Sequence, residues 1–188
     1  MRIIGGRFRG RKLQAFKGSD VRPTADRVRE ALFNILARKF IDAEVLDLFA
    51  GTGALGIEAL SRGALAAVFV DNSALSLAVL RKNLDRCGLQ HCTQTIQWDI
   101  ARSLACLKGY PKTFNLVFMD PPYHRGLVPT TLQHLVDSGC LVPEALLAAE
   151  HEADMKPELP SSHFACIDHR RYGRTALSFF AYLDPLAG

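Results

Sequence analysis

The sequence lacks any apolar run that approaches the roughly 20 residues of a membrane-spanning helix. Its first residues, MRIIGGRFRGRKLQ, are basic, but the apolar stretch of a secretion signal does not follow them. Internal repeats and low-complexity linkers are also lacking. We therefore expect a soluble, cytoplasmic chain without a membrane partner, whose 188 residues form one good-sized core.

Cysteine occurs without the spacing of a disulfide framework or a zinc site. The cysteines are odd in number and contain no CxxC pair; they are Cys87, Cys92, Cys106, Cys140 and Cys166. Cys87 and Cys92 flank His91 but do not have zinc-finger spacing. We expect all the thiols to be reduced and mostly buried, as is typical of cytoplasmic proteins, and we expect no metal site.

Positive charge, in contrast, is abundant near the start of the chain. Residues 1–29 contain nine Lys and Arg against two Asp, whereas the whole chain has a net charge of +4. The rest of the chain is therefore slightly acidic. A basic cluster of this kind is expected where a protein contacts a phosphate backbone, and a solubilising arm is the alternative.

Short apolar runs predict strands throughout the chain. Four of them are separated by helical patterns, at 44–50, 66–71, 93–99 and 114–120. Two more are joined by a turn at Gly173 within residues 164–183. Residues 146–152, LLAAEHE, have the composition of a helix but the place of a strand in the alternation. The first 16 residues predict a hairpin of two short strands around Gly5 and Gly6.

Helical spacing of apolar residues predicts the elements between the strands. Helices are expected over 22–40, 55–63, 74–88 and 128–139, with Thr24 able to cap the first and Ser73 the third. The alternation predicts an α/β fold with a mostly parallel seven-stranded sheet, helices on both faces, and an antiparallel edge made by the closing strands. We expect residues 1–40 to be a basic N-terminal extension of hairpin and helix, and residues 41–188 to be the α/β domain.

A glycine-rich loop follows the first strand of the alternation. In DLFAGTGALGIEAL, Gly51, Gly53 and Gly56 lie between that strand and a helix, and Asp71 ends the next strand, twenty residues after Gly51. Glycines let the backbone approach a nucleotide, and an acid at this distance binds ribose hydroxyls. The pattern alone does not separate a dinucleotide from S-adenosylmethionine, and a tight packing turn is the structural alternative.

Two details favour S-adenosylmethionine over a dinucleotide. Asp47 precedes the loop, where a carboxylate can reach an ammonium group but would repel a pyrophosphate. Asp99 ends the third strand and can accept a hydrogen bond from an adenine amine, with Ile100 or Trp98 packed on the ring. Trp98 as a core residue is the alternative. The expected cofactor site also includes Phe49 and Asn72.

The stretch FNLVFMDPPY ends a predicted strand in an unusual way. The apolar run stops at Asp120, and Pro121, Pro122 and Tyr123 follow. The carboxyl ends of parallel strands meet at one edge of a sheet, so Asp120 is expected at the same rim as the other strand-ending acids, Asp71 and Asp99.

These four residues suit methylation of a nucleobase amine, whose lone pair is delocalised into the ring and is therefore a poor nucleophile. The Asp120 carboxylate and the Pro121 carbonyl can accept the amine hydrogens, so that the nitrogen pyramidalises toward a methyl donor. Consecutive prolines stiffen the loop, and Tyr123 offers a face on which the base can stack. A proline-stiffened turn without chemistry is the structural alternative.

The DPPY stretch resembles the motif of amino-group methyltransferases that use S-adenosylmethionine. The segments GGRFRGRKL, RPTADRVREALFNIL, VLDLFAGTGALGIEALSRGA, FMDPPY and YGRTALSFF occur in this order over nearly the whole chain. Together they are similar to the RsmD family of bacterial 16S rRNA guanine-N2 methyltransferases. The resemblance implies a Rossmann-like class I methyltransferase fold, S-adenosyl-L-methionine as cofactor, and the N2 amine of a guanine in small-subunit 16S rRNA as target.

Carried over by position, the resemblance assigns roles at the site. The methionine end of the cofactor would be lined by Gly51 and Gly53. Its ribose and adenine amine would be bound by Asp71 and Asp99. The target base would be held by Asp120, Pro121 and Tyr123, on the loop stiffened by Pro122.

The resemblance also implies contacts with rRNA in the small subunit or its assembly intermediate. Phosphates would be contacted by Arg7, Arg9, Arg11 and Lys12. Arg22 and Thr24 would lie near the active site, although Thr24 is also the expected helix cap. Arg125 and its neighbour His124 follow the motif and are candidates for substrate contact or simply exposed loop residues. We expect a monomer whose small basic extension shares recognition of the particle with ribosomal proteins.

Other functions fit parts of the sequence. DNA adenine-N6 methylation uses the same chemistry, but little of the chain is left for a separate recognition region. Methylation of a glutamine amide calls for Asn in place of Asp120. A non-catalytic RNA-binding assembly module would be expected to have lost the glycine loop or the acid of DPPY. A nicotinamide enzyme would explain the glycine loop but not DPPY.

Overall fold

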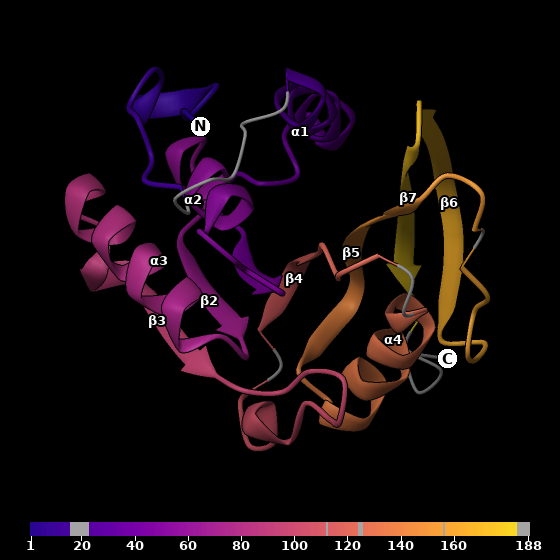
Figure 1. Ribbon diagram of the computed structural model, residues 1–188. Helices are drawn as coiled ribbons and strands as arrows, with labels where there is room; N and C mark the ends of the chain where they lie inside the picture. Colours follow the sequence, from indigo (N-terminus) through magenta and orange to yellow (C-terminus); the bar gives the residue numbers. More distant parts are fainter. Residues whose placement is uncertain (16–22, 112, 124–125, 156, 184–188) are drawn as a thin grey trace.

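The computed structural model describes the chain except residues 16–22, 112, 124–125, 156 and 184–188 (Figure 1). The described strands form one seven-stranded sheet. In chain order they are β1 (Glu44–Leu48), β2 (Ala66–Asp71), β3 (Thr93–Gln97), β4 (Phe114–Met119), β5 (Leu141–Glu152), β6 (Phe164–Tyr172) and β7 (Thr175–Tyr182). The helices are α1 (Pro23–Leu36), α2 (Ala54–Ser61), α3 (Ala74–Cys87) and α4 (Leu127–Ser138), with single 3-10 turns η1 (Gly6–Phe8), η2 (Gln90–Cys92) and η3 (Ala105–Leu107).

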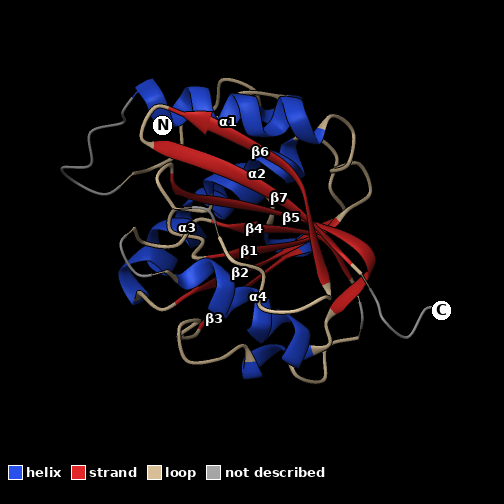
Figure 2. Ribbon diagram, turned by 90° about the vertical axis from the view of Figure 1, so that its right-hand side faces the viewer, coloured by secondary structure: helices blue, strands red, loops and turns tan. Residues whose placement is uncertain are grey.

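The strand order across the sheet is β3-β2-β1-β4-β5-β7-β6. Strands β1 to β5 run parallel, and β7 runs antiparallel to both of its neighbours, β5 and β6. The predicted fold class, with antiparallel pairing toward one edge, is therefore confirmed. The reversed strand is the penultimate one, because β7 inserts between β5 and the outermost strand β6 (Figure 2).

Two apolar clusters cover the two faces of the sheet. Alternate residues of a strand point to opposite faces, so Val45 of β1 joins one cluster and Leu46 the other. The first cluster also receives the apolar faces of α1, α2 and α3, and the second receives that of α4. Ile3 and Leu13 from the N-terminal segment belong to the first cluster. Packing is thus continuous across residue 40, and the predicted functional division at that point stays a prediction.

The hairpin expected over residues 1–16 is wrong in detail. A single antiparallel bridge joins Arg2 to Lys12, and η1 occupies the middle of the segment. The physical reason is competition for the backbone amides: those of Ile4 and Gly5 donate to the carboxylate of Glu58 on α2, at 2.8 and 2.7 Å, instead of to a second strand.

Other element boundaries also differ from the sequence pattern. The expected strand at 93–99 ends at Gln97, and Trp98 is 37% exposed, so the core alternative for Trp98 is wrong. Helix α1 begins at Pro23, which places Thr24 inside the first turn and not at the cap. Ser73 does cap α3, since its hydroxyl accepts from the Ser76 amide at 3.2 Å. The ambiguous stretch at 146–152 is strand.

The described residues contain no helix long and apolar enough to cross a membrane. All the cysteines are free thiols, as expected, but only Cys87 and Cys140 are buried and Cys166 is exposed. The expectation that most are buried is therefore wrong. The amino end of the chain lies beside α2, at the opposite end of the molecule from strands β6 and β7 (Figure 1).

Candidate functional site

A pocket of about 280 Å³ opens at the carboxyl ends of β1, β2 and β4, the edge at which parallel sheets bind ligands. Its lining residues come from the loops that follow these strands and from the turn after β3. They are Phe49, Asp71, Asn72, Trp98, Asp99, Ile100, Ala101, Asp120, Pro122 and Leu127. The structure therefore brings together most residues that the sequence assigned to a cofactor, including Trp98, and it adds Ala101 and Leu127. The predicted residues Asp47, Gly51 and Gly53 are not among the lining residues.

The glycine loop at this pocket has two different requirements for glycine. Gly51 has a φ of +55° and Gly53 a φ of +80°, and such values disfavour side chains. A Cβ on Gly53 would lie 2.1 Å from a methyl group of the buried Leu80, whereas one on Gly51 would meet nothing closer than 3.9 Å. Gly53 thus allows the loop to pack on α3, and the surface at Gly51 remains open to a ligand.

Asp71 holds the glycine loop in place from the end of β2. Its Oδ2 accepts from the Gly51 amide at 2.8 Å, and its Oδ1 accepts from the Ser73 amide at 2.8 Å. A carboxylate has about four lone-pair sites, so each oxygen can still accept a further hydrogen bond on the pocket side. Asp71 therefore holds the glycine loop and also lines the pocket where the ribose contact is predicted.

Asp47 lies beneath the loop and is only 2% exposed. Its Oδ2 accepts from the Gly56 amide in the first turn of α2 at 2.9 Å. Burial, and to a lesser extent the charge of Asp71, raise the pKa of Asp47 to about 8, although the Gly56 amide opposes the shift. The side chain is fixed to the helix below the pocket, and its predicted contact with an ammonium group stays a prediction.

The DPPY loop closes the other side of the same pocket. Asp120 follows β4, and part of its side chain is exposed at the opening, although protein atoms crowd its carboxyl group. Desolvation of that group, then the charges of Glu150 and Asp47, raise the pKa of Asp120 well above its ordinary value. Pro122 and Leu127 form part of the wall of this pocket. The acid and the rigid turn thus line the same cavity as Asp71, which holds the glycine loop.

The sequence interpretation missed Glu150, which belongs to this group. The Tyr123 hydroxyl donates to Glu150 Oε1 at 3.0 Å and lies 2.8 Å from Thr175 Oγ1. Burial raises the pKa of Glu150 above its ordinary value, and it raises that of Tyr123 to about 12. The missed signal is an acid directly after the apolar run ALLAA, in the strand next to β4.

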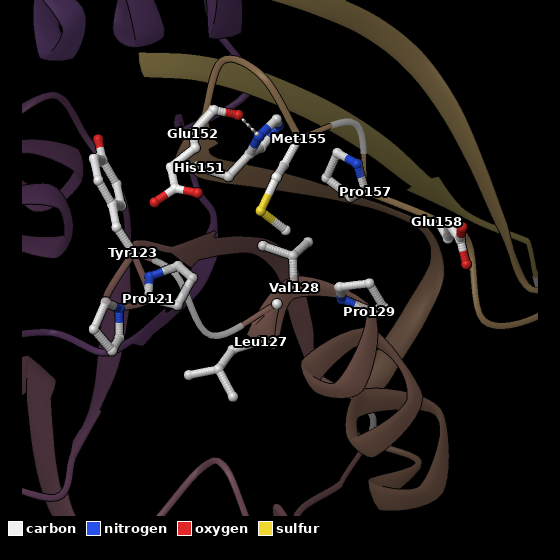
Figure 3. Close-up of a pocket in the computed structure, with 12 residues that line it drawn as sticks. Pro121, Tyr123, Leu127, Val128, Pro129, His151, Glu152, Met155, Pro157 and Glu158 are labelled. Atoms are coloured by element: carbon white, nitrogen blue, oxygen red, sulfur yellow. Dashed lines mark hydrogen bonds between the residues drawn. The ribbon is translucent and has the colours of Figure 1, made fainter. Parts of the chain in front are cut away.

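A second pocket of about 240 Å³ lies behind the DPPY loop and shares Pro122 and Leu127 with the first. It runs between the start of α4 and the chain after β5. Figure 3 shows Tyr123 and Pro121 at one end, with the Met155 side chain directed toward Val128. Proline rings and aliphatic groups form most of the labelled wall, so this pocket suits a flat apolar group.

The predicted RNA contacts lie on the N-terminal segment, which α2 holds in place. Besides the Glu58 contacts, the Phe8 amide donates to Ser61 Oγ at 3.0 Å. The guanidinium groups of Arg7 and Arg11 lie 4.6 and 4.9 Å from the Phe8 ring centroid. The four predicted phosphate contacts are all exposed: Arg7, Arg9, Arg11 and Lys12.

The remaining substrate predictions lie outside this description. Arg22, His124 and Arg125 fall outside the described residues, and of Thr24 only its place in α1 is described.

Asn83 of α3 holds the far end of the N-terminal segment. The Gln14 amide donates to Asn83 Oδ1 at 2.7 Å. The Asn83 side-chain amide donates to the Thr52 carbonyl in the glycine loop at 3.0 Å. One side chain therefore joins the basic segment to the loop.

Comparison with known proteins agrees with this arrangement. A family model described as conserved hypothetical protein 95 matches residues 1–181. Ribosomal RNA small subunit methyltransferase D of Escherichia coli (strain K12) is 46% identical over 154 residues, which cover 82% of this chain and 76% of the relative. The Haemophilus influenzae protein of the same name is 36% identical over 175 residues, covering 92% and 89%. A solved structure from Escherichia coli, provisionally named methyltransferase yhhF, matches with a TM-score of 0.84 at 38% identity over 97% of this chain and 98% of its own.

Proposed function

We propose a function from the premise that the chain belongs to the ribosomal RNA small subunit methyltransferase D family. The chain is a methyltransferase. Its proposed reaction transfers a methyl group from S-adenosylmethionine to the exocyclic N2 amine of a guanine in 16S rRNA. The observation that carries this proposal is the shared pocket: Asp120 and Pro122 of the amine-binding motif line the same cavity as Asp71 beside the glycine loop.

The pocket residues fit S-adenosylmethionine, which supplies an electrophilic methyl group on a sulfonium centre. The open surface at Gly51 suits the methionine end, and Gly53 and Asn72 border the same loop and pocket. Asp71 would accept from the ribose hydroxyls and Asp99 from the adenine amine. Apolar contact with the adenine ring is expected from Phe49 and Ile100. The buried Asp47 lies beneath the loop, on the side expected for the ammonium group, and a bound ammonium group would favour its ionised form.

Asp120 and the Pro121 carbonyl would hold the two hydrogens of the guanine amine, and Tyr123 would stack on the base. Holding the amine lets its nitrogen lone pair point at the methyl group. As the new N–C bond forms and the S–C bond breaks, positive charge moves from sulfur to the amine nitrogen. Asp120 stabilises that charge and takes up the proton that the nitrogen then loses, before passing it to water.

The N-terminal segment is the proposed rRNA contact, which gives residues 1–40 the role of a basic extension and residues 41–188 that of the methyltransferase domain. Exposed cations on a rigid support suit phosphate binding. The contacts proposed are Arg7, Arg9, Arg11 and Lys12, with Arg22, Thr24 and Arg125 added on the resemblance alone. A monomer acting on the small subunit or its assembly intermediate, in part through ribosomal proteins, is the proposed working form.

The test is methyl incorporation from labelled S-adenosylmethionine. Small subunits lacking the modification, naked 16S rRNA and duplex DNA are offered to the wild type, to Asp120→Ala, and to the exposed control Asp137→Ala. We expect N2-methylguanosine in RNA. The rate should fall about a hundredfold in Asp120→Ala and stay at the wild-type level in Asp137→Ala. Methyladenine in DNA would overturn the substrate assignment, and equal activity of Asp120→Ala would overturn the role of that acid.

A further inference from the structure

Glu150 is an acid beside the DPPY loop that the proposed mechanism does not use. It lies in β5, beside β4, and the register pairs Met119 with Ala149. The next residue along each parallel strand is an acid, Asp120 on one and Glu150 on the other. The two carboxylates are therefore neighbours at the carboxyl ends of adjacent strands.

The contacts of Glu150 lead to the DPPY loop. Its Oε1 accepts from the Tyr123 hydroxyl at 3.0 Å, and that hydroxyl also meets Thr175 Oγ1, in the first residue of β7, at 2.8 Å. Tyr123 nevertheless remains 39% exposed. Its hydroxyl end is thus anchored to two strands, while the ring keeps an open surface.

We propose that Glu150 is a positioning residue for methyl transfer: together with Thr175 it fixes the Tyr123 hydroxyl and so presets the ring on which the target base stacks. This inference rests on the proposed function. An anchored ring needs no ordering when the base arrives, and preorganisation of this kind keeps the amine in line with the methyl group. The sheet itself, through β5 and β7, therefore sets the orientation of a loop residue.

Glu150 also sets the charge around Asp120. The ionisable groups around Asp120 are Glu150 from β5, Asp47 from β1 and Tyr123 of the DPPY loop. The β7 residue that contacts Tyr123 is the uncharged Thr175. After burial, the charge of Glu150 is the next cause of the raised pKa of Asp120. Removing that charge lowers the pKa of Asp120, so the carboxylate needed for the reaction persists to lower pH.

The experiment compares Glu150→Ala, Tyr123→Phe, the double variant and a matched control, Glu144→Ala, which makes the same change at an exposed position of β5. Substrate is the small subunit lacking the modification. We expect Glu150→Ala and Tyr123→Phe each to lower kcat/KM about tenfold, with cofactor Kd within about twofold of the wild type. Because both changes break the same Tyr123–Glu150 hydrogen bond, the double variant should be no less active than the less active single variant.

The pH profile separates positioning from general destabilisation. In Glu150→Ala the acid limb of kcat/KM should move to lower pH, whereas in Tyr123→Phe and Glu144→Ala the Glu150 charge remains and the shift should be absent. Wild-type rates for Glu150→Ala, or multiplicative losses in the double variant, would overturn the inference while leaving the proposed function intact. A wild type that binds cofactor but methylates no subunit would instead refute the proposed function.

Discussion

The two ends of helix α2 hold two different parts of the molecule by the same chemistry. At its N-terminal end, the buried side chain of Asp47 accepts a hydrogen bond from the Gly56 amide and so fixes the first turn of the helix after the glycine loop. Toward its C-terminal end, the fully buried carboxylate of Glu58 accepts the amides of Ile4 and Gly5 and fixes the basic segment. A short helix thus connects the expected cofactor loop to the expected RNA contact.

The two contacts differ in how far apart their partners lie in the sequence. Asp47 and Gly56 are nine residues apart, whereas Ile4 and Glu58 are 54 apart. Glu58 also has a cationic partner, Arg62, at 2.7 Å, while burial of Asp47 raises its pKa to about 8. The Glu58 contacts therefore join distant parts of the sequence, whereas the Asp47 contact lies within a single strand, turn and helix unit.

The largest effect is expected where the segment is held. Glu58→Ala leaves two amides and the guanidinium of Arg62 without their acceptor, which should lower the free energy of unfolding by about 3 kcal/mol. Urea denaturation measures this loss, with exposed Glu30→Ala as control. Cofactor affinity should fall much less than rRNA affinity. A loss below about 0.5 kcal/mol would mean that the segment is not held by Glu58.

A smaller, pH-dependent effect is expected at the loop end. With a pKa of about 8 when folded, above its unfolded value, Asp47 takes up a proton on folding at neutral pH. Stability from this group is therefore present at low pH and is lost as pH rises toward 8, by at most about 1.4 kcal/mol per pH unit. Asp47→Asn keeps an acceptor for Gly56 and removes this slope.

Urea denaturation between pH 6 and 9 checks the slope at Asp47. The variant should gain stability relative to the wild type up to about pH 8, after which the difference should level off. The exposed change Asp137→Asn should show no such trend. Parallel stability curves for wild type and Asp47→Asn would mean that Asp47 is already ionised in the folded protein at neutral pH.

The smallest effect is expected on the exposed face of the segment. Arg9→Ala removes one proposed phosphate contact, so the slope of log K against log salt for rRNA binding should become less steep by about one. Stability should change by less than about 0.5 kcal/mol. Filter binding at several salt concentrations measures the slope, with exposed Arg38→Ala as control. An unchanged slope would remove Arg9 from the proposed RNA surface.

Local patterns predicted the sheet, and they also predicted most of the residues that line the pocket at its edge. The glycine loop, Asp71, Asp99 and the DPPY residues are each defined by neighbours in sequence, and the parallel topology brings their strand ends together. Gly53 has a further requirement that its motif does not show, since its absent side chain makes room for Leu80. That requirement comes from α3, which the motif does not contain.

Residues whose roles depend on distant partners were not predictable in this way. Glu150 lies in a stretch whose composition fits a helix, and it becomes part of the site only because β5 pairs with β4. Glu58 had a weak signal, a single acid in the apolar helix ALGIEALS, which implies a buried partner but does not identify it. The hairpin prediction failed for the same reason, because Glu58 takes the amides that a second strand would need.

The place of β7 between β5 and β6 has a consequence for the protein during its synthesis. In a nascent chain β5 and β6 emerge first, and the edge of β5 that includes the buried Ala148 and Ala149 stays unpaired until β7 arrives. Open apolar edges of this kind are where growing chains associate wrongly. Thr175 arrives with the same strand, so the Tyr123 anchor is completed only after translation of β7 has closed the sheet.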